Sequence, residues 1–546
     1  MKASRFLKGI LAIAVLAVTA QTRAQSIPVT AVPAVRVKTA NEPVATGRFS
    51  PTWESLKQYQ TPEWFRDAKF GIWACFGPQC QAEDGDWYAR GMYDPGSAQY
   101  NFHVAHYGSP SNFGFKDLAH AWHAENWDPE KLLALYKRAG AQYFFAMVNH
   151  HDNFDCWNSK YQPWNSVNVG PKKDLIAGWA KAARDQGLRF GVSVHAAHAW
   201  TWFELAQDFD GRQTRAEGKG LWWDGLDPQD LYAQNHERSL NDFKLWDIIP
   251  LWNWSRGASL PDQAYCDKFY NRTMDLINQF HPDLIYFDDT ALPLWPASDA
   301  GLQIAAHFYN DNQRRHGDDG ALFGKMLDAD ELPCMVRDIE RGTSNEIEPR
   351  PFQTDTCIGD WHYSRSIYDH HGYKSAKTVI HMLADIVSKN GNLLLNIPVR
   401  GDGTIDDQEE KIVNDIAAWM AVNRDGILGT RPWKVLGEGP ALGSAPPLQA
   451  QGFNEGKGRP FTAQDVRFTT KGNILYAIVL GWPTNGINLQ SLGKSAKLLD
   501  PPIEKIQLLG SREEIDWRQT DGGLFISQPR TKPSDIAIVF AITLKT

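Results

Sequence analysis

The chain has 546 residues, a formal net charge of −8 and 22 tryptophans. This length exceeds what a single hydrophobic core usually serves, so at least two domains are expected. With this negative net charge, the chain lacks the excess of basic residues that is typical of proteins that bind nucleic acid or an anionic membrane surface. The charge does not exclude small neutral molecules as substrates. Tryptophan rings, which also carry an N–H donor, suit stacking on sugar faces, although most of them are expected to fill the core.

Residues 1–24 have the pattern of a secretory signal peptide, with cations at the start, an apolar run over 9–18 and small residues before the cleavage site. That run is too short to anchor the chain in a bilayer, and no later segment reaches the about 18 apolar residues of a membrane helix. We expect an exported protein, periplasmic or secreted. Residues 25–55, rich in Pro, Val, Ala and Thr without a period, predict a flexible leader. Of the six scattered cysteines, Cys75 and Cys80 are close enough in sequence for a local pair, but nothing compels one.

From about residue 61, apolar runs bounded by turn residues alternate with helical patterns. Strands are predicted at 69–76, 143–148, 189–194 and 284–287, with weaker candidates at 324–327, 352–358 and 393–397. Helices are predicted at 128–140, 174–186 and 406–422, and Asp128 suits the N-cap of the first. The alternation indicates βαβ units and a parallel sheet, and so many units favour a (β/α)8-type barrel over 56–432, irregular near the weaker strands.

Beyond Gly426 the pattern changes to short alternating segments, such as 474–480 and 536–542, separated by Gly, Pro, Asn and Asp. This texture predicts an all-β C-terminal domain over 433–546, built as a sandwich. It contains no cluster of catalytic residue types.

The most informative segment runs from His281 to Thr290, because its apolar core ends in two carboxylates, Asp288 and Asp289. In parallel α/β folds the catalytic groups lie at the carboxyl ends of the strands. Asp288 is therefore the first candidate for a catalytic group. An Asp that caps the following helix would give the same pattern.

Two further strand ends carry polar groups. Asp86 and Trp87 follow the first strand, where the ring suits stacking on a ligand beside the carboxylate acceptor. His150 and His151 close the second strand, and one of them at least is expected to reach a central ligand. A solvated loop or a metal site is the alternative for the pair. A metal site would require further ligands at the ends of neighbouring strands, and His195, His198 and Asp288 could supply them.

Carboxylates are also concentrated after the fifth predicted strand, where Asp338, Glu340, Glu346 and Glu348 occur within eleven positions. Retaining glycoside hydrolysis requires two carboxyl groups about 5–5.5 Å apart, one as nucleophile and one as acid/base.

The chain resembles the α-L-fucosidases of glycoside hydrolase family 29 over roughly residues 60–440, and into the C-terminal domain through Asn473–Trp482. The matching segments are Ala68–Pro78, Gly85–Arg90, Asn149–Trp157, Ser159–Tyr161, Trp164–Ser166, Gly170–Leu175, Pro282–Asp288 and Ser388–Asn396. The resemblance implies a retaining exo-hydrolase that removes terminal L-fucose from fucosylated glycans, with no metal and no organic cofactor.

The resemblance also implies roles for individual residues. Asp288 matches the family's nucleophile, and His150 and His151 match a pair that binds sugar hydroxyls. Trp73 and Trp361 match aromatic positions that enclose the fucose methyl group. The remaining expected sugar-binding positions are Cys75, where relatives commonly have a His, Asp86, where they usually have a Glu, and Trp87, His195 and Tyr286.

The acid/base lies on variable loops in this family, and Glu340 is close to the implied position. Arg341 and Gly342 provide a tight turn after it, and Glu346 and Glu348 are the alternatives. Many relatives carry a Trp-Glu pair further on, but Gln353 stands there and cannot transfer a proton. Two other functions remain open. One is a metal-dependent barrel hydrolase that uses the histidines, and the other is a carbohydrate-binding protein that kept the fold and lost activity.

Overall fold

Eight parallel strands close into a barrel in the computed structural model, which describes residues 34–240, 249–255, 257–448 and 452–545. Each strand pairs with the next, and β8 pairs with β1. This confirms the predicted barrel. Its strands are β1 (Phe70–Ala74), β2 (Tyr143–Asn149), β3 (Arg189–Val194), β4 (Leu284–Phe287), β5 (Ala321–Gly324), β6 (Val336–Glu340), β7 (Phe352–Cys357) and β8 (Gly391–Asn396).

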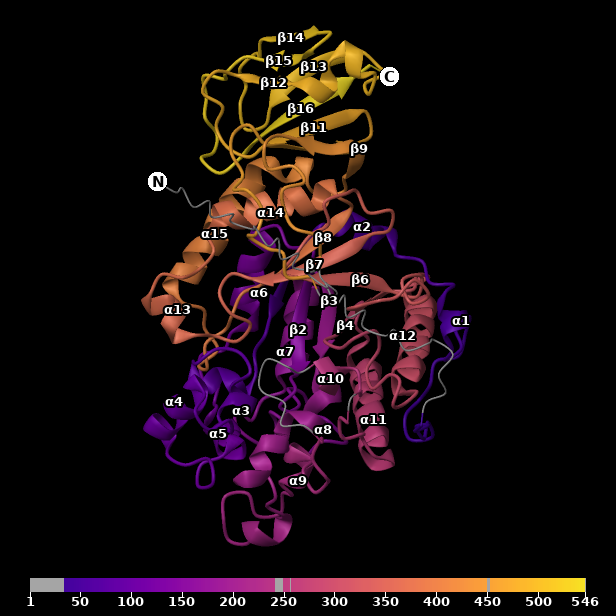
Figure 1. Ribbon diagram of the computed structural model, residues 1–546, viewed down its shortest axis with the longest axis vertical. Helices are drawn as coiled ribbons and strands as arrows, with labels where there is room; N and C mark the ends of the chain where they lie inside the picture. Colours follow the sequence, from indigo (N-terminus) through magenta and orange to yellow (C-terminus); the bar gives the residue numbers. More distant parts are fainter. Residues whose placement is uncertain (1–33, 241–248, 256, 449–451, 546) are drawn as a thin grey trace, which may run out of the picture.

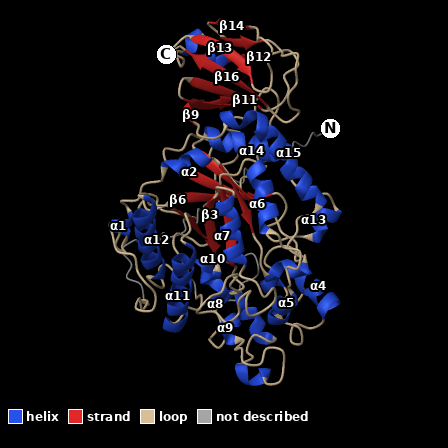
Figure 2. Cartoon of the chain, turned by 180° about the vertical axis from the view of Figure 1, so that it is seen from behind, coloured by secondary structure: helices blue, strands red, loops and turns tan. Residues whose placement is uncertain are grey.

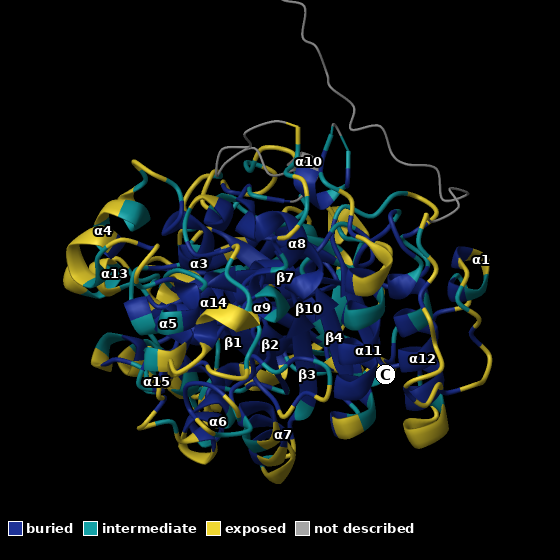
Figure 3. Ribbon diagram, turned by 90° about the horizontal axis from the view of Figure 1, so that it is seen from below, coloured by how far each residue is buried: buried dark blue, intermediate teal, exposed yellow. Residues whose placement is uncertain are grey.

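Six long helices cover the barrel. They are α6 (Pro129–Arg138), α7 (Leu175–Asp185), α11 (Gln263–Phe280), α12 (Ala300–His316), α14 (Ala376–Ser388) and α15 (Asp407–Asn423). The side chain of Asp128 accepts a backbone N–H bond at the start of α6, as predicted, and those of Asp174 and Asp406 do the same at the starts of α7 and α15. Figure 3 shows the buried residues gathered around the strands and the exposed ones on the outward faces of helices such as α6 and α7.

The barrel is irregular between β5 and β7, as the weak strand patterns predict. Both connections in this fully described stretch lack an α-helix. β5 pairs with β6 over only two positions, Phe323 with Val336 and Gly324 with Arg337. Two expectations need correction here. The strand predicted at 324–327 lies at 321–324, and Glu340 is the last residue of strand β6 rather than a loop residue.

The other helices, most of them of four to seven residues, sit mainly in the loops that follow the strands. They are α1 (Trp53–Leu56), α2 (Glu63–Ala68), α3 (Tyr88–Gly91), α4 (Ala98–Tyr107), α5 (Phe115–Ala121), α8 (Ala199–Trp202), α9 (Gln229–Tyr232), α10 (Ile249–Trp252) and α13 (Arg365–Asp369). The loops after β1 and β3, which carry α3–α5 and α8–α10, lie at the end of the molecule opposite the C-terminal domain (Figure 1).

The C-terminal domain consists of antiparallel sheets, coloured red at the top of Figure 2. One sheet has the order β13-β16-β11-β10-β9 and the other the order β12-β15-β14. The strands are β9 (Arg431–Glu438), β10 (Val466–Lys471), β11 (Ile474–Val479), β12 (Ile487–Leu489), β13 (Ile503–Leu508), β14 (Trp517–Thr520), β15 (Gly523–Ile526) and β16 (Ile538–Leu544). Buried residues of both sheets form one apolar cluster, as the predicted all-β domain requires.

The expected flexible leader is wrong for residues 34–55, the part that the structure describes. Asn310 of α12 accepts from the Phe49 N–H and donates to the carbonyls of Ala45 and Phe49. Phe49 packs on Tyr309 with ring centroids 4.9 Å apart. The segment runs along the helices in an irregular path, which is why its sequence has no period. The predicted signal peptide and residues 25–33 lie outside the described residues.

All six cysteines are described, and each is a buried free thiol. Cys75 and Cys80 are not joined, and the Cys80 thiol instead lies 3.6 Å from the Cys75 carbonyl. Among the described helices, none has the length and apolar character needed to cross a membrane.

Candidate active site

A narrow pocket lies at the carboxyl ends of the barrel strands. It brings together most of the residues that the sequence analysis selected. Its lining consists of Trp73, Cys75, Asp86, Trp87, His150, His195, Trp252, Tyr286, Asp288, Lys325, Glu340, Asp355 and Trp361. His151 lies directly behind this lining, with its Nε2 3.3 Å from Asp288 Oδ2.

Asp288 follows β4, whose four residues are fully buried, so the strand delivers its carboxylate into the pocket. Its Oδ1 accepts from the Lys325 ammonium at 2.8 Å, and its Oδ2 lies 3.1 Å from His195 Nδ1. Burial alone would raise the pKa of Asp288, but Lys325, His151 and His195 outweigh burial and hold the pKa well below its ordinary value. Asp288 is therefore an anion at neutral pH.

Glu340 ends β6 on the other side of the same ammonium. Its Oε2 lies 2.6 Å from Lys325 Nζ. Burial, helped by repulsion from Asp355 and Asp288, raises the pKa of Glu340 to about 7 despite the attraction of Lys325. Because Asp288 and Glu340 contact one nitrogen atom, these two oxygens are separated by no more than the sum of 2.8 and 2.6 Å. This is an upper limit for these two oxygen atoms. It lies below the about 6.5–9.5 Å of inverting glycosidases and agrees with the shorter separation, about 5–5.5 Å, of retaining ones.

A second carboxyl pair lies next to Glu340. Burial raises the pKa of Asp338 to about 6 and that of Asp355 well above its ordinary value, the latter helped by repulsion from Asp338. A proton shared between them explains how both stay buried. Tyr286 donates to Asp355 Oδ2 at 3.2 Å, and Gln353 donates to Asp338 Oδ2 at 2.8 Å. Gln353 therefore supports this pair from within the barrel.

The tautomer of His150 follows from its neighbours. Gln79 Oε1 accepts from the Ala89 N–H, so Gln79 Nε2 donates to His150 Nδ1 at 2.9 Å. Burial and the adjacent histidines hold the His150 pKa well below its usual value, so the ring is neutral and carries its proton on Nε2, 3.8 Å from Asp86 Oδ1. That nitrogen is a donor, which suits an oxygen atom of a ligand.

The histidines and carboxylates form two groups with the spacing of metal ligands, His150–His151–His195 and Asp86–His150–His362. His150 belongs to both groups, and its pocket-facing nitrogen holds a proton in the arrangement described above. Asp86 Oδ1 is already bound by His362 Nδ1 at 2.6 Å. These hydrogen bonds fit polar ligand recognition better than metal coordination.

Aromatic rings form the apolar wall of the pocket. Trp73 lies with its ring centroid 5.3 Å from those of Trp361 and Tyr286. Trp87 has φ +62°, a left-handed conformation that bulky residues seldom adopt, and packs against Trp252 at the pocket edge. The Cys75 thiol, whose pKa burial raises well above its usual value, lines the pocket as an uncharged and weak hydrogen-bond partner.

Three candidates lie outside the pocket. Glu346 is exposed, and Glu348 forms an ion pair with Arg337 at 2.9 Å. His198, a ligand in the metal alternative, lies with its Nε2 3.1 Å from Asp289. The structure thus unites Asp288 with Glu340 and with neither alternative glutamate.

Comparisons with known proteins agree with this geometry. The family model described as alpha-L-fucosidase matches residues 37–425, and the model of the alpha-L-fucosidase C-terminal domain matches residues 459–546. The chain belongs to the α-L-fucosidase family. Tissue alpha-L-fucosidase of Homo sapiens is 25% identical over 517 residues, which cover 91% of each chain. That of Mus musculus is 26% identical over 518 residues, covering 92% of this chain and 95% of its own. The crystal structure of Thermotoga maritima alpha-fucosidase in complex with fucose has a TM-score of 0.66 at 25% identity, covering 91% of this chain and 100% of that chain.

Sequence reasoning missed four residues at the pocket of this α-L-fucosidase family member: Lys325, Asp355, Trp252 and His362. The available signal for Lys325 was a lone cation directly after an apolar strand. Asp355 offered only a charged residue inside a predicted strand. Trp252 and His362 lie on long connections between strands, where the sequence has no periodic pattern that would indicate which side chains face the pocket.

Proposed function

We propose that this protein is an exo-acting α-L-fucosidase that hydrolyses terminal α-L-fucose with retention, by double displacement. The observation that carries the proposal is the pair of carboxyl groups on Lys325. Asp288 has a pKa well below its ordinary value, and Glu340 has a pKa of about 7. Neighbouring carboxyl groups whose environments push their pKa values apart are suited to act as nucleophile and acid.

In the first step, Asp288 attacks the anomeric carbon while Glu340 gives its proton to the leaving oxygen. The bond from the anomeric carbon to the aglycone breaks, and an ester to Asp288 forms. His195 donates Nδ1–H to Asp288 Oδ2 and so fixes the orientation of the attacking carboxylate. The His195 pKa is lowered chiefly by burial, so this ring is a neutral donor.

In the second step, Glu340 is an anion and takes a proton from water, which attacks the anomeric carbon and releases Asp288. Two inversions give net retention. Because the first step needs ionised Asp288 and protonated Glu340, the rate should fall as the pH rises through about 7.

Recognition of the sugar follows from the pocket walls. His150 Nε2–H and Asp86 supply a donor and an acceptor for hydroxyl groups, while Trp73 and Trp361 offer an apolar surface for the C5 methyl group. The related Thermotoga maritima enzyme was solved in complex with fucose. Aromatic rings bound the pocket, which favours a single terminal residue over an internal one.

Incubation with a panel of fucosylated oligosaccharides in the presence of a chelator tests the proposal. Release of L-fucose that is insensitive to chelator, with the α anomer formed first in proton NMR spectra, is the expected result. Loss of activity on chelation would favour the metal-dependent hydrolase. Binding of fucose without any release would favour a carbohydrate-binding protein.

We also propose that the protein is exported, on the strength of the signal pattern in residues 1–24. Mass spectrometry of the exported protein should give an N-terminus at residue 25. Retention of the full chain in the cytoplasm would contradict this.

A further inference from the structure

Glu340 lies at the least supported point of the barrel. β5 pairs with β6 only at Phe323–Val336 and Gly324–Arg337, so residues 338–340 have no partner in β5. Neither of the two connections that flank β6 contains an α-helix, and both are fully described. A strand end with one free edge has too few contacts of its own to hold a side chain within the small tolerance that proton transfer needs.

A segment of the C-terminal domain occupies the free edge. Gly452 forms an isolated parallel bridge with Glu340, and it belongs to the connection between β9 and β10. The peptide that follows Glu340 is held from both sides. Its carbonyl accepts from the Phe453 N–H at 2.8 Å, and its N–H, that of Arg341, donates to the Asp355 carbonyl at 2.8 Å.

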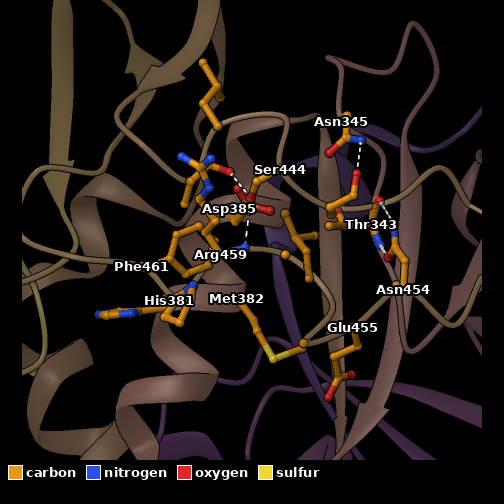
Figure 4. A pocket seen from close by; sticks show the side chains of 18 of the residues that line it. Thr343, Asn345, His381, Met382, Asp385, Ser444, Asn454, Glu455, Arg459 and Phe461 are labelled. Carbon is orange, nitrogen blue, oxygen red and sulfur yellow. Dashed lines mark hydrogen bonds between the residues drawn. The ribbon is translucent and has the colours of Figure 1, made fainter. Parts of the chain in front are cut away.

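Side chains fasten the same segment. Asn454, which is 4% exposed, accepts from the Thr343 N–H at 2.9 Å and donates to the Thr343 carbonyl at 3.0 Å. Figure 4 shows Asn454 and Thr343 facing each other beside a cavity of about 570 Å³. Glu455 adds an ion pair with Lys374 at 2.6 Å and accepts from Thr356 Oγ1 at 2.6 Å. One side of the segment borders this cavity, and these polar contacts, together with the backbone bonds to Glu340 and Arg341, attach the segment to the barrel.

We propose that residues 452–455 of the C-terminal domain are positioning residues for Glu340, so that the all-β domain contributes to acid/base catalysis. The inference rests on the proposed role of Glu340. The hydrogen bonds and ion pair described for this segment reach the pocket lining only through the Glu340 backbone, so the segment should act on proton transfer and not on binding of the sugar.

Gly452→Ala tests the inference sharply. Gly452 has φ +115°, and an added Cβ would come within 2.2 Å of the Glu340 carbonyl oxygen. The matched control is Gly456→Ala, four positions on, where φ is +70° but nothing lies within 4 Å of an added Cβ. Both variants carry backbone strain, and only the first one pushes on Glu340.

We expect Gly452→Ala to lower kcat for fucosyl oligosaccharides by about 10- to 100-fold, because displacement by about 1 Å can cost that much. KM should change little. An aryl fucoside with an activated leaving group needs less acid assistance and should be spared, whereas Gly456→Ala should behave as wild type with both substrates. Equal losses with both substrates, or no loss, in Gly452→Ala would overturn the proposal.

Asn454→Ala, which removes the hydrogen bonds to Thr343 without steric pressure, decides the matter if Gly452→Ala does not fold. A loss confined to poor leaving groups supports positioning, and a uniform or absent loss overturns it. Glu340→Gln is measured in parallel. If it lacks the leaving-group dependence, the proposed role of Glu340 fails. If it shows the dependence and the segment variants do not, only the positioning role fails.

Discussion

Lys325→Met probes the electrostatics of the pocket most directly. The Lys325 side chain is 3% exposed, and its ammonium contacts Asp288 at 2.8 Å and Glu340 at 2.6 Å. Methionine keeps the length and apolar stem of the side chain and removes the charge. Both carboxyl groups should then become harder to ionise, because each loses a cation and keeps an anionic neighbour.

The size of the change follows from the contacts. Two unit charges about 4 Å apart interact by about 4 kcal/mol at an effective dielectric constant of about 20, equivalent to about three pKa units. The contacts of Lys325 are shorter than this distance, which makes the interaction stronger. Water that enters beside the methionine would in turn stabilise the carboxylates and make the rise of their pKa values smaller. We therefore expect the pKa values of Asp288 and Glu340 to rise by about 1–3 units. We expect the alkaline limb of the pH profile to follow the proposed acid Glu340, whose pKa is raised to about 7, so this limb should move to higher pH by the same amount.

The assay is kcat/KM for an aryl α-L-fucoside across the pH range, with thermal unfolding measured beside it. Lys389→Met is the matched control, since it removes another buried ammonium, 2.5 Å from Asp385 and outside the pocket. Both variants should lose stability, by up to about 3–5 kcal/mol for a broken buried pair. Only Lys325→Met should shift the profile. A folded Lys325→Met with the wild-type alkaline limb would refute the ion-pair account.

Three further outcomes are expected. Asp288→Ala should lower kcat by about 10³-fold or more, and azide should rescue it and give the β-configured fucosyl azide. An active Asp288→Ala together with an inactive Asp289→Ala would assign the nucleophile to Asp289 instead. Glu340→Gln should slow oligosaccharide hydrolysis by about 10²–10⁴-fold, spare activated aryl fucosides and remove the alkaline limb, and Glu348→Gln should do none of this. Trp361→Ala should erode the preference for aryl α-L-fucoside over aryl α-L-galactoside, which we expect to be worth about 1–3 kcal/mol in the wild type, and equal specificity constants in the wild type would remove the methyl-pocket idea.

The regular half of the barrel was predictable because its signals are local. An apolar run that ends in a carboxylate gave the position of β4 and Asp288, and the predicted strand at 189–194 coincides with β3. The predicted cap at Asp128 located the start of α6 within a residue, since it depends on a hydrogen bond to Lys131, only three positions along the chain.

β6 was not predictable by the same means. Three of its five residues, Arg337, Asp338 and Glu340, are charged, so the segment has the composition of a loop. Their burial is possible only because partners arrive from distant positions, such as Lys325 for Glu340 and Gln353 for Asp338. Long-range pairing of this kind leaves no periodic pattern in the sequence.

The six buried thiols have a consequence for where this chain can fold. No disulfide bond has to form or be reshuffled, so folding requires neither an oxidant nor a disulfide isomerase. Burial raises the pKa of each thiol, to about 12 for Cys80, Cys266, Cys334 and Cys357, and so keeps the reactive thiolate scarce. The native enzyme should therefore keep its activity in reducing and oxidising media alike. A change of redox compartment would leave its core intact.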